Sequence, residues 1–274
     1  MDSVVPSSQT SPTINYIIPT YPGKYPKRLT DPKSGEFLNR QLILLNELLE
    51  HKKKENIPCL INNVTIIKVK CKPIHQEYEN YYDIELWKTL VNICDKIKII
   101  DYEGRNEHFS YDQWLIALLQ STDDYNILIE DDYYIDTDNL HFDLELIQKY
   151  KDKFPDNKGY LCSYVGLNPV IHAAISNGIV SKESVQLLGE NVLNEFYSKS
   201  IFREHINYNI MVYPQIVFSV LFTQKEMMIK DTCNEYVTYF WDSPKMKIID
   251  FTESVVCTEQ TFVPIQMYYR HQSK

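Results

Sequence analysis

Glycine is scarce in this chain, which has 7 glycines among 274 residues, well below the roughly 7% of an average protein. Two glycine-rich phosphate-binding motifs are absent, namely the G-x-G-x-x-G fingerprint of dinucleotide-binding folds and the G-x-x-x-x-G-K-[ST] P-loop. Both absences argue against a dinucleotide-binding enzyme or a P-loop enzyme. If the protein binds phosphate, side chains and a metal ion must hold it rather than a glycine-rich loop.

Closely spaced cysteine pairs and long apolar runs are missing as well. None of the six cysteines forms a C-x-x-C pair, so a structural zinc site is not expected. The polar, Ser/Pro-rich amino terminus lacks the basic and apolar regions of a signal peptide. No run approaches the roughly 18 apolar residues that a membrane-spanning helix needs. We therefore expect no membrane span and a cytoplasmic protein with reduced thiols.

Excess positive charge is also absent, because 28 basic residues face 37 acidic ones and give a net charge of −9. A sequence-independent nucleic-acid binder needs a basic surface, so no nucleic-acid partner is expected. The hydrophobic fraction of 44% and the charged fraction of 24% are ordinary for a soluble globular protein. The abundance of Tyr, Asn, Ile and Lys is typical of an AT-rich genome, such as that of a large virus or a protist. A viral origin would place the protein in the host cytoplasm or the virion.

The most informative segment present is an apolar run that ends in three consecutive acids. Residues 127–129 (Ile-Leu-Ile) predict a buried strand, and Glu130, Asp131 and Asp132 follow it directly. Side chains alternate along a strand, so Glu130 and Asp132 are expected on one face and Asp131 on the other. Carboxylates that converge repel each other unless a cation lies between them, and such oxygen ligands suit Mg²⁺ or Mn²⁺. The alternative interpretation is a solvated acidic loop without chemistry.

Strands and helices alternate over the first half of the chain. This alternation predicts right-handed crossovers and an α/β fold with a mostly parallel sheet flanked by helices. Ligands of such sheets bind at the carboxyl ends of the strands, where Thr20, Asp101 and the three acids are expected. The predicted strands are 15–19, 64–69, 97–100 and 126–129, and the predicted helices are 37–52, 83–95 and 111–120.

The second half predicts a less regular α+β arrangement. A helix capped by Ser181 is expected to continue through Phe196, and a buried helix is expected to begin near Pro214. No internal repeat or long linker interrupts the chain, so residues 14–274 are expected to form one domain after a disordered tail at 1–13. The remaining predicted elements are a helix at 143–151 and strands or extended segments at 159–165, 227–229, 236–240 and 246–249.

The order of these elements and motifs resembles the GT-A fold of nucleotide-sugar-dependent glycosyltransferases. Residues 17–21 (Ile-Ile-Pro-Thr-Tyr), Asp101 at the end of the third strand, and residues 130–132 carry the resemblance. The last segment looks like the family's D-x-D element with Glu in first place, and the helix at 111–120 before it matches the pattern. The similarity covers about residues 14–230, and the sequence is similar in character to the glycosyltransferases of large DNA viruses.

The resemblance implies a nucleotide-diphosphate sugar as donor, a glycan or protein acceptor, and Mn²⁺ or Mg²⁺ as cofactor. It assigns donor binding to residues 14–135 and acceptor binding to residues 136–274. The metal would be held by Glu130 and Asp132, with His271 near the carboxyl terminus. The implied donor-binding residues are Pro19, Thr20, Tyr21, Asp101, Arg105, Glu130 and Asp131.

The chain departs from the family pattern at Gln215. Inverting members carry an acid at the start of this helix, where it activates the acceptor hydroxyl, and an amide cannot do so. Either another group has taken that role or the enzyme retains configuration. The candidate catalytic residues are Asp131, Glu204, His205 and Asp231, and the candidate acceptor or sugar contacts, in what the family pattern makes an acceptor-facing loop, are His172, Ser176 and Asn177.

Two other functions remain open at this point. A sugar-phosphate nucleotidyltransferase also uses an α/β sheet and acidic metal ligands, but it normally has a glycine-rich amino-terminal loop, and residues 19–24 contain one glycine. A non-catalytic carbohydrate- or protein-binding module on a decayed transferase fold is favoured by Gln215 and disfavoured by the intact acid triplet. Release of pyrophosphate would identify the first, and the absence of donor turnover would identify the second.

Overall fold

The structure of the chain is a computed structural model that describes residues 11–20, 35–69, 90–103, 108, 110–131, 133–135, 138–167, 171–200, 212–232 and 237–239. Several predictions fall outside these ranges: most of the tail at 1–13, most of the helix at 83–95, the strand at 246–249, and the site residues Tyr21, Arg105, Asp132, Glu204, His205 and His271.

A seven-stranded sheet forms the centre of the molecule, with the strand order β3-β2-β1-β4-β7-β6-β8. The pairs β1–β2, β2–β3, β1–β4 and β6–β8 are parallel, and β7 runs antiparallel to both β4 and β6. This mostly parallel α/β architecture confirms the predicted fold class. The strands are β1 (Ile14–Thr20), β2 (Ile61–Val69), β3 (Ile97–Tyr102), β4 (Tyr125–Leu128), β6 (Gly159–Gly166), β7 (His172–Ser181) and β8 (Met228–Asp231).

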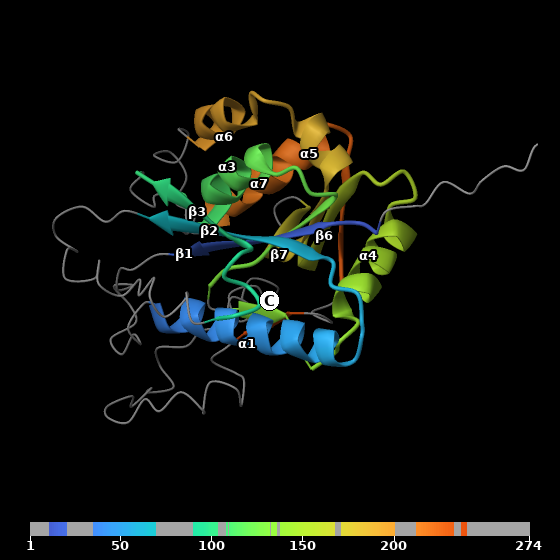
Figure 1. Cartoon of the computed structure of the whole chain (residues 1–274). Helices are drawn as coiled ribbons and strands as arrows, with labels where there is room; N and C mark the ends of the chain where they lie inside the picture. The colour runs from blue at the N-terminus through green and yellow to red at the C-terminus, as the bar shows by residue number, and fades with distance from the viewer. Residues whose placement is uncertain are drawn as a thin grey trace, which may run out of the picture.

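Helices cover both faces of this sheet, so the molecule has three layers (Figure 1). One face packs against α1 (Gly35–Lys54) and α4 (Phe142–Lys153), and the other against α3 (Ser110–Gln120), α6 (Val192–Ser200) and α7 (Val212–Gln224). A short helix, α5 (Lys182–Leu188), follows β7, and β5 (Tyr133–Ile135) pairs with β9 (Val237–Tyr239) in a small second sheet. None of the helices in the described ranges is long and apolar enough to cross a membrane.

The strand that leads into the acids is buried on both faces. Ile127 and Ile129 belong to the core beneath α1 and α4, and Leu128 belongs to the core beneath α3 and α7. A strand covered on both sides needs apolar residues at every position rather than at alternate ones. The continuous apolar run before Glu130 therefore follows from the position of β4 in the middle of the sheet.

Two predicted helices differ from the structure. In the described part of the segment 83–95, residues 91–96 form turns rather than a helix. The helix expected from Ser181 to Phe196 is two helices, α5 and α6. Ser181 caps α5 as predicted, with its hydroxyl accepting a hydrogen bond from the Ser184 N–H at 3.1 Å. Gly189, at φ 79°, ends α5, because a left-handed residue does not continue a helix.

The small residues after His172 form a strand, so the prediction of a loop at this place is wrong. They belong to β7, which lies between β4 and β6. A side chain at Gly178 would place its Cβ 2.1 Å from the carbonyl oxygen of Leu161. Small residues are required here because the backbone of β6 approaches β7 closely.

Candidate functional site

The candidate site lies where the strand order of the sheet reverses. From β1 the chain continues outward to β2 and β3 on one side, and then returns to place β4 on the other side of β1. Ligands of open α/β sheets bind in the crevice at the carboxyl ends of the strands beside such a reversal. Thr20 ends β1, and its hydroxyl donates a hydrogen bond to Oδ2 of Asp131 at 3.1 Å. The structure therefore joins the ends of β1 and β4, as the sequence predicts.

We call Glu130 and Asp131, which follow β4, the acidic turn. Both residues are half-buried. The Ser110 hydroxyl, at the start of α3, donates to Oε1 of Glu130 at 2.9 Å, and Thr20 donates to Asp131 from β1. Each carboxylate is thus oriented by a hydroxyl from a different element.

The main chain of the acidic turn is held by side chains from α1 and from the strand β7. From α1, the Gln41 side-chain N–H₂ donates to the carbonyl oxygens of Glu130 at 2.9 Å and Asp131 at 2.7 Å. From β7, the Asn177 side-chain oxygen accepts a hydrogen bond from the Glu130 N–H at 2.6 Å. Gln41 is not among the site residues predicted from the sequence. A polar residue between Leu38 and Leu45 on the apolar face of this helix was the signal that could have found it.

A buried polar network supports the start of β7 beside the turn. The register between β6 and β7 shifts twice there. The Gln215 amide N–H₂, on α7, donates to the carbonyl oxygen of Ala174 at 2.7 Å, to that of Ala173, and to the Ser176 hydroxyl at 3.2 Å. Tyr111 also shares a hydrogen bond with the Ser176 hydroxyl at 3.1 Å. Gln215 is 5% exposed, so it is a structural donor within the core.

Other predicted site residues lie away from the acidic turn. His172 is fully buried, and its ring lies against Gly166, where an added Cβ would come within 2.8 Å of it. Asp231, at the end of β8, accepts a hydrogen bond from the Val165 N–H at 3.0 Å, and three strand spacings separate β8 from β4, roughly 14 Å. Asp101 is exposed on the edge strand β3, two spacings from β1. The structure brings together Pro19 and Thr20, Glu130 and Asp131, and Ser176 and Asn177.

The acidic turn offers oxygen ligands of the kind that Mg²⁺ and Mn²⁺ prefer. Its two carbonyl oxygens accept hydrogen bonds from Gln41, which leaves the carboxylates of Glu130 and Asp131 as the groups suited to a metal. Within the described part of the chain, no group of three or more His, Cys, Asp or Glu side chains could hold a metal ion. The predicted ligands Asp132 and His271 lie outside the described residues.

A fully buried carboxylate, that of Asp112 in the first turn of α3, lies near the end of β3. Its Oδ2 accepts hydrogen bonds from the hydroxyls of Tyr102 and of Tyr197, the latter at 3.3 Å, and lies 3.6 Å from His108 Nδ1. Burial and then the Asp112 carboxylate raise the pKa of Tyr102 well above its usual value and that of Tyr197 to about 12. The phenols therefore stay protonated and tie β3 and α6 to α3.

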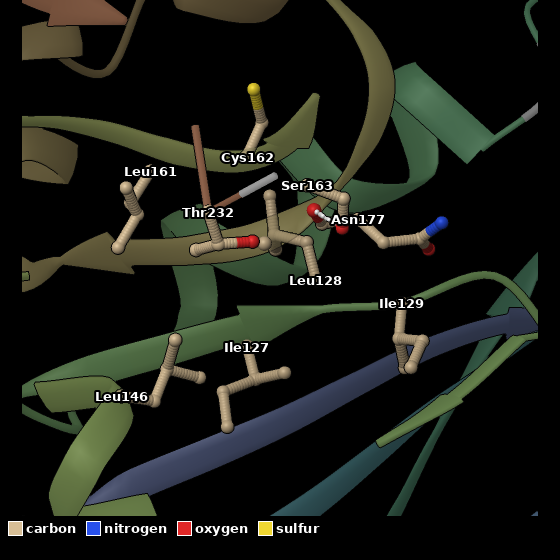
Figure 2. A pocket seen from close by; sticks show the side chains of 10 residues that line it. Ile127, Leu128, Ile129, Leu146, Leu161, Cys162, Ser163, Asn177 and Thr232 are labelled. Carbon is tan, nitrogen blue, oxygen red and sulfur yellow. Dashed lines mark hydrogen bonds between the residues drawn. The ribbon is translucent and has the colours of Figure 1, made fainter. Parts of the chain in front are cut away.

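A small cavity lies inside the molecule between β4, β6 and β7 (Figure 2). Figure 2 shows Ser163 and Asn177 at its wall, joined by the bond from the Ser163 hydroxyl to the Asn177 carbonyl oxygen at 2.8 Å. Its volume is about 10 Å³, at the lower limit of what one water molecule needs. The cavity is too small for a sugar or a nucleotide.

No protein-family model matches this sequence, and no curated protein matches it. Solved structures resemble its fold. S. aureus TarS matches over 82% of this chain and 36% of its own, at 12% identity and a TM-score of 0.44. The glycosyltransferase GlyE of Streptococcus pneumoniae TIGR4 matches over 80% of this chain and 45% of its own, at 12% identity and a TM-score of 0.46.

A third similar structure is a glycosyltransferase involved in the glycosylation of the major capsid of PBCV-1. It matches over 86% of this chain and 96% of its own, at 11% identity and a TM-score of 0.45. By contrast, this chain spans less than half the length of TarS and of GlyE. At 11–12% identity these similarities concern the fold alone.

Proposed function

We propose that this protein is a metal-dependent glycosyltransferase that moves a sugar from a nucleotide-diphosphate sugar to a hydroxyl of a glycan or protein acceptor. The observation that carries the proposal is the position of the acidic turn. It lies at the reversal of strand order between β1 and β4, where α/β sheets bind nucleotides, and Thr20 and Ser110 orient its carboxylates.

The chemistry of sugar transfer suits such a site. Breaking the bond between a sugar and a diphosphate develops negative charge on the leaving oxygen, and Mn²⁺ or Mg²⁺ held by the carboxylates would stabilise that charge without proton transfer. The residues of this chain hold the carboxylates and the main chain of the acidic turn in place. Hydroxyls of Thr20 and Ser110 each hold one carboxylate oxygen, and Gln41 holds the main chain behind them.

Gln215 has no role as a base in this proposal. Both hydrogens of its amide point to acceptors within the core, and the side chain is buried. Either another group activates the acceptor hydroxyl, for which the sequence offers Asp131, Glu204 and His205, or the enzyme retains configuration; the fourth candidate, Asp231, lies three strands from the acidic turn. The same feature favours a second candidate function, a carbohydrate-binding module that binds nucleotide sugars or glycans without turnover.

Ligand-dependent stability tests the proposal directly. The intact protein is heated with UDP, GDP and their sugar derivatives, each with and without Mn²⁺. A ligand at about 100 times its dissociation constant adds ~2.7 kcal/mol to the free energy of unfolding. We expect such a shift with one nucleotide family, only in the presence of Mn²⁺, and its loss in Asp131→Asn. Glu190→Gln, which removes an exposed carboxylate in the link between α5 and α6, is the matched control and should keep the full shift.

The outcomes separate the candidate functions. No shift with any nucleotide, with or without Mn²⁺, would sink the transferase proposal. A shift without release of the sugar would identify the binding module. Release of pyrophosphate from a nucleoside triphosphate and a sugar phosphate would identify a nucleotidyltransferase.

A further inference from the structure

Gln41 is a buried amide that donates hydrogen bonds to the acidic turn. It lies on the apolar face of α1, in line with Leu38 and Leu45, and is 1% exposed. Its two N–H hydrogens serve two acceptors, the successive carbonyl oxygens of Glu130 and Asp131. Its own side-chain oxygen has no hydrogen-bond partner in the described part of the chain. A leucine at this position would extend the apolar face without burying a polar oxygen.

Regular strand pairing between β4 and β1 does not extend to the main chain of the acidic turn. Regular pairing of β4 with β1 ends at Leu128, and the Ile129 N–H makes the next bond to β1 at 3.1 Å. Beyond it, the main chain of the acidic turn accepts hydrogen bonds from Gln41, donates one to Asn177 and makes the turn bond from the Tyr133 N–H to the Glu130 carbonyl oxygen. The position of the turn's main chain therefore depends on side chains from α1 and β7.

We propose that Gln41 is a positioning residue that sets the affinity of the acidic turn for a divalent cation without touching the cation. This inference rests on the proposed function, because it concerns the same site. A planar amide with two donors can bridge two successive carbonyl oxygens, whereas a carboxylate at the same place would repel them and a thioether would leave both unpaired. With either replacement the turn can rotate, which changes the direction of its two carboxylates.

The test measures Mn²⁺ binding to the intact protein with no donor sugar present, by the electron paramagnetic resonance signal of free Mn²⁺. Gln41→Met keeps the volume and removes both donors. Gln41→Asn keeps the amide and shortens its reach. We expect the dissociation constant for Mn²⁺ to be at least tenfold larger in both variants than in the unmodified protein. Leu45→Met, a volume-conserving change on the same face of α1, is the control and should bind Mn²⁺ as the unmodified protein does.

Each result separates this inference from the proposed function. If the unmodified protein and the Gln41 variants bind Mn²⁺ equally, Gln41 does not position the turn, and the proposed function stands. If the unmodified protein binds no Mn²⁺ even when UDP is added, both proposals are wrong. If neither variant folds, Gln41 is a stability residue and the inference is overturned. Weaker Mn²⁺ binding with an unchanged melting temperature is the result that a purely structural role would not give.

Discussion

Two buried glutamines hold the main chain from opposite faces of the same sheet. Gln41 reaches the acidic turn from α1, and Gln215 reaches the start of β7 from α7. In each, one amide group donates to two successive carbonyl oxygens where a strand leaves regular pairing. Their effects differ, because Gln41 holds residues that carry charge and Gln215 holds residues that are buried and neutral.

The layers behind the two glutamines also differ. The α1 layer contains a buried ion pair, with Lys52 Nζ 2.7 Å and 2.6 Å from the two carboxylate oxygens of Asp143 on α4. The α7 layer is held by aromatic packing, such as Phe218 against Trp114 and Tyr160. The layer that contains α1 therefore has a buried charge pair in addition to its apolar packing, whereas the layer that contains α7 is packed by aromatic rings.

Breaking the ion pair should have the largest effect. Lys52→Met leaves the Asp143 carboxylate buried without its partner, and removal of one member of a buried pair typically lowers the free energy of unfolding by about 3–5 kcal/mol. Urea unfolding measures the change. The double variant Lys52→Met/Asp143→Leu removes both charges and should recover most of the loss. A single-variant loss below ~1 kcal/mol would show that α1 is not anchored at this point.

Gln215→Glu should have the second largest effect. The substitution leaves the carbonyl oxygens of Ala173 and Ala174 without their donor, and each buried unsatisfied group costs about 1–3 kcal/mol. We expect a loss of ~2–4 kcal/mol in urea unfolding and no gain in sugar transfer. The control is Gln224→Glu at the exposed end of the same helix, which should change stability by less than ~0.5 kcal/mol. An increase in transfer rate in Gln215→Glu would instead identify this position as a lost base that faces the acceptor.

Local patterns were sufficient to predict the parallel part of the fold and the place of the acids. Two patterns indicate burial: the continuous apolar run before Glu130 and the leucine spacing around Leu42. Each lies within a single strand or helix, so it can be recognised from neighbouring residues alone. The end of a strand in a parallel sheet then follows from general rules of topology. Those two steps placed Thr20 beside the acidic turn without any knowledge of distant contacts.

The supports of the site could not be predicted in the same way. Gln41 lies 89 residues from Glu130 in the sequence, and Asn177 lies 47 residues from it. Such pairings depend on strand order, and no local pattern encodes the antiparallel position of β7 between β4 and β6. The break at Gly189 is different, because a glycine inside a helical pattern is a visible signal of a helix end, and the apolar spacing of its neighbours outweighed it.

The smallest expected effect concerns two tyrosines, one on each face of the sheet. Tyr125 packs in the core beneath α1 and α4, and Tyr197 lies on α6, on the face of the sheet covered by α3 and α7. Burial, followed by the negative charges of Glu183 and Asp112 respectively, raises the pKa of each phenol from 10.0 to about 12. A raised pKa in the folded state means that the folded protein keeps a proton that the unfolded chain loses. The stability from this difference is complete below pH 10 and disappears as the pH rises to about 12.

Unfolding of Tyr125→Phe and Tyr197→Phe in urea at several pH values between 9 and 12 tests this on each face separately. Each variant should lose less stability over this range than the unmodified protein, because phenylalanine has no proton to release. Tyr164→Phe, at an exposed tyrosine, is the control and should follow the unmodified protein. If only one of the two variants shows a smaller loss of stability with rising pH, the sensitivity to alkaline pH arises on the face of the sheet where that tyrosine lies. If neither does, the pKa of neither phenol is raised in the folded protein, and the contact between Tyr197 and Asp112 does not hold α6 against α3.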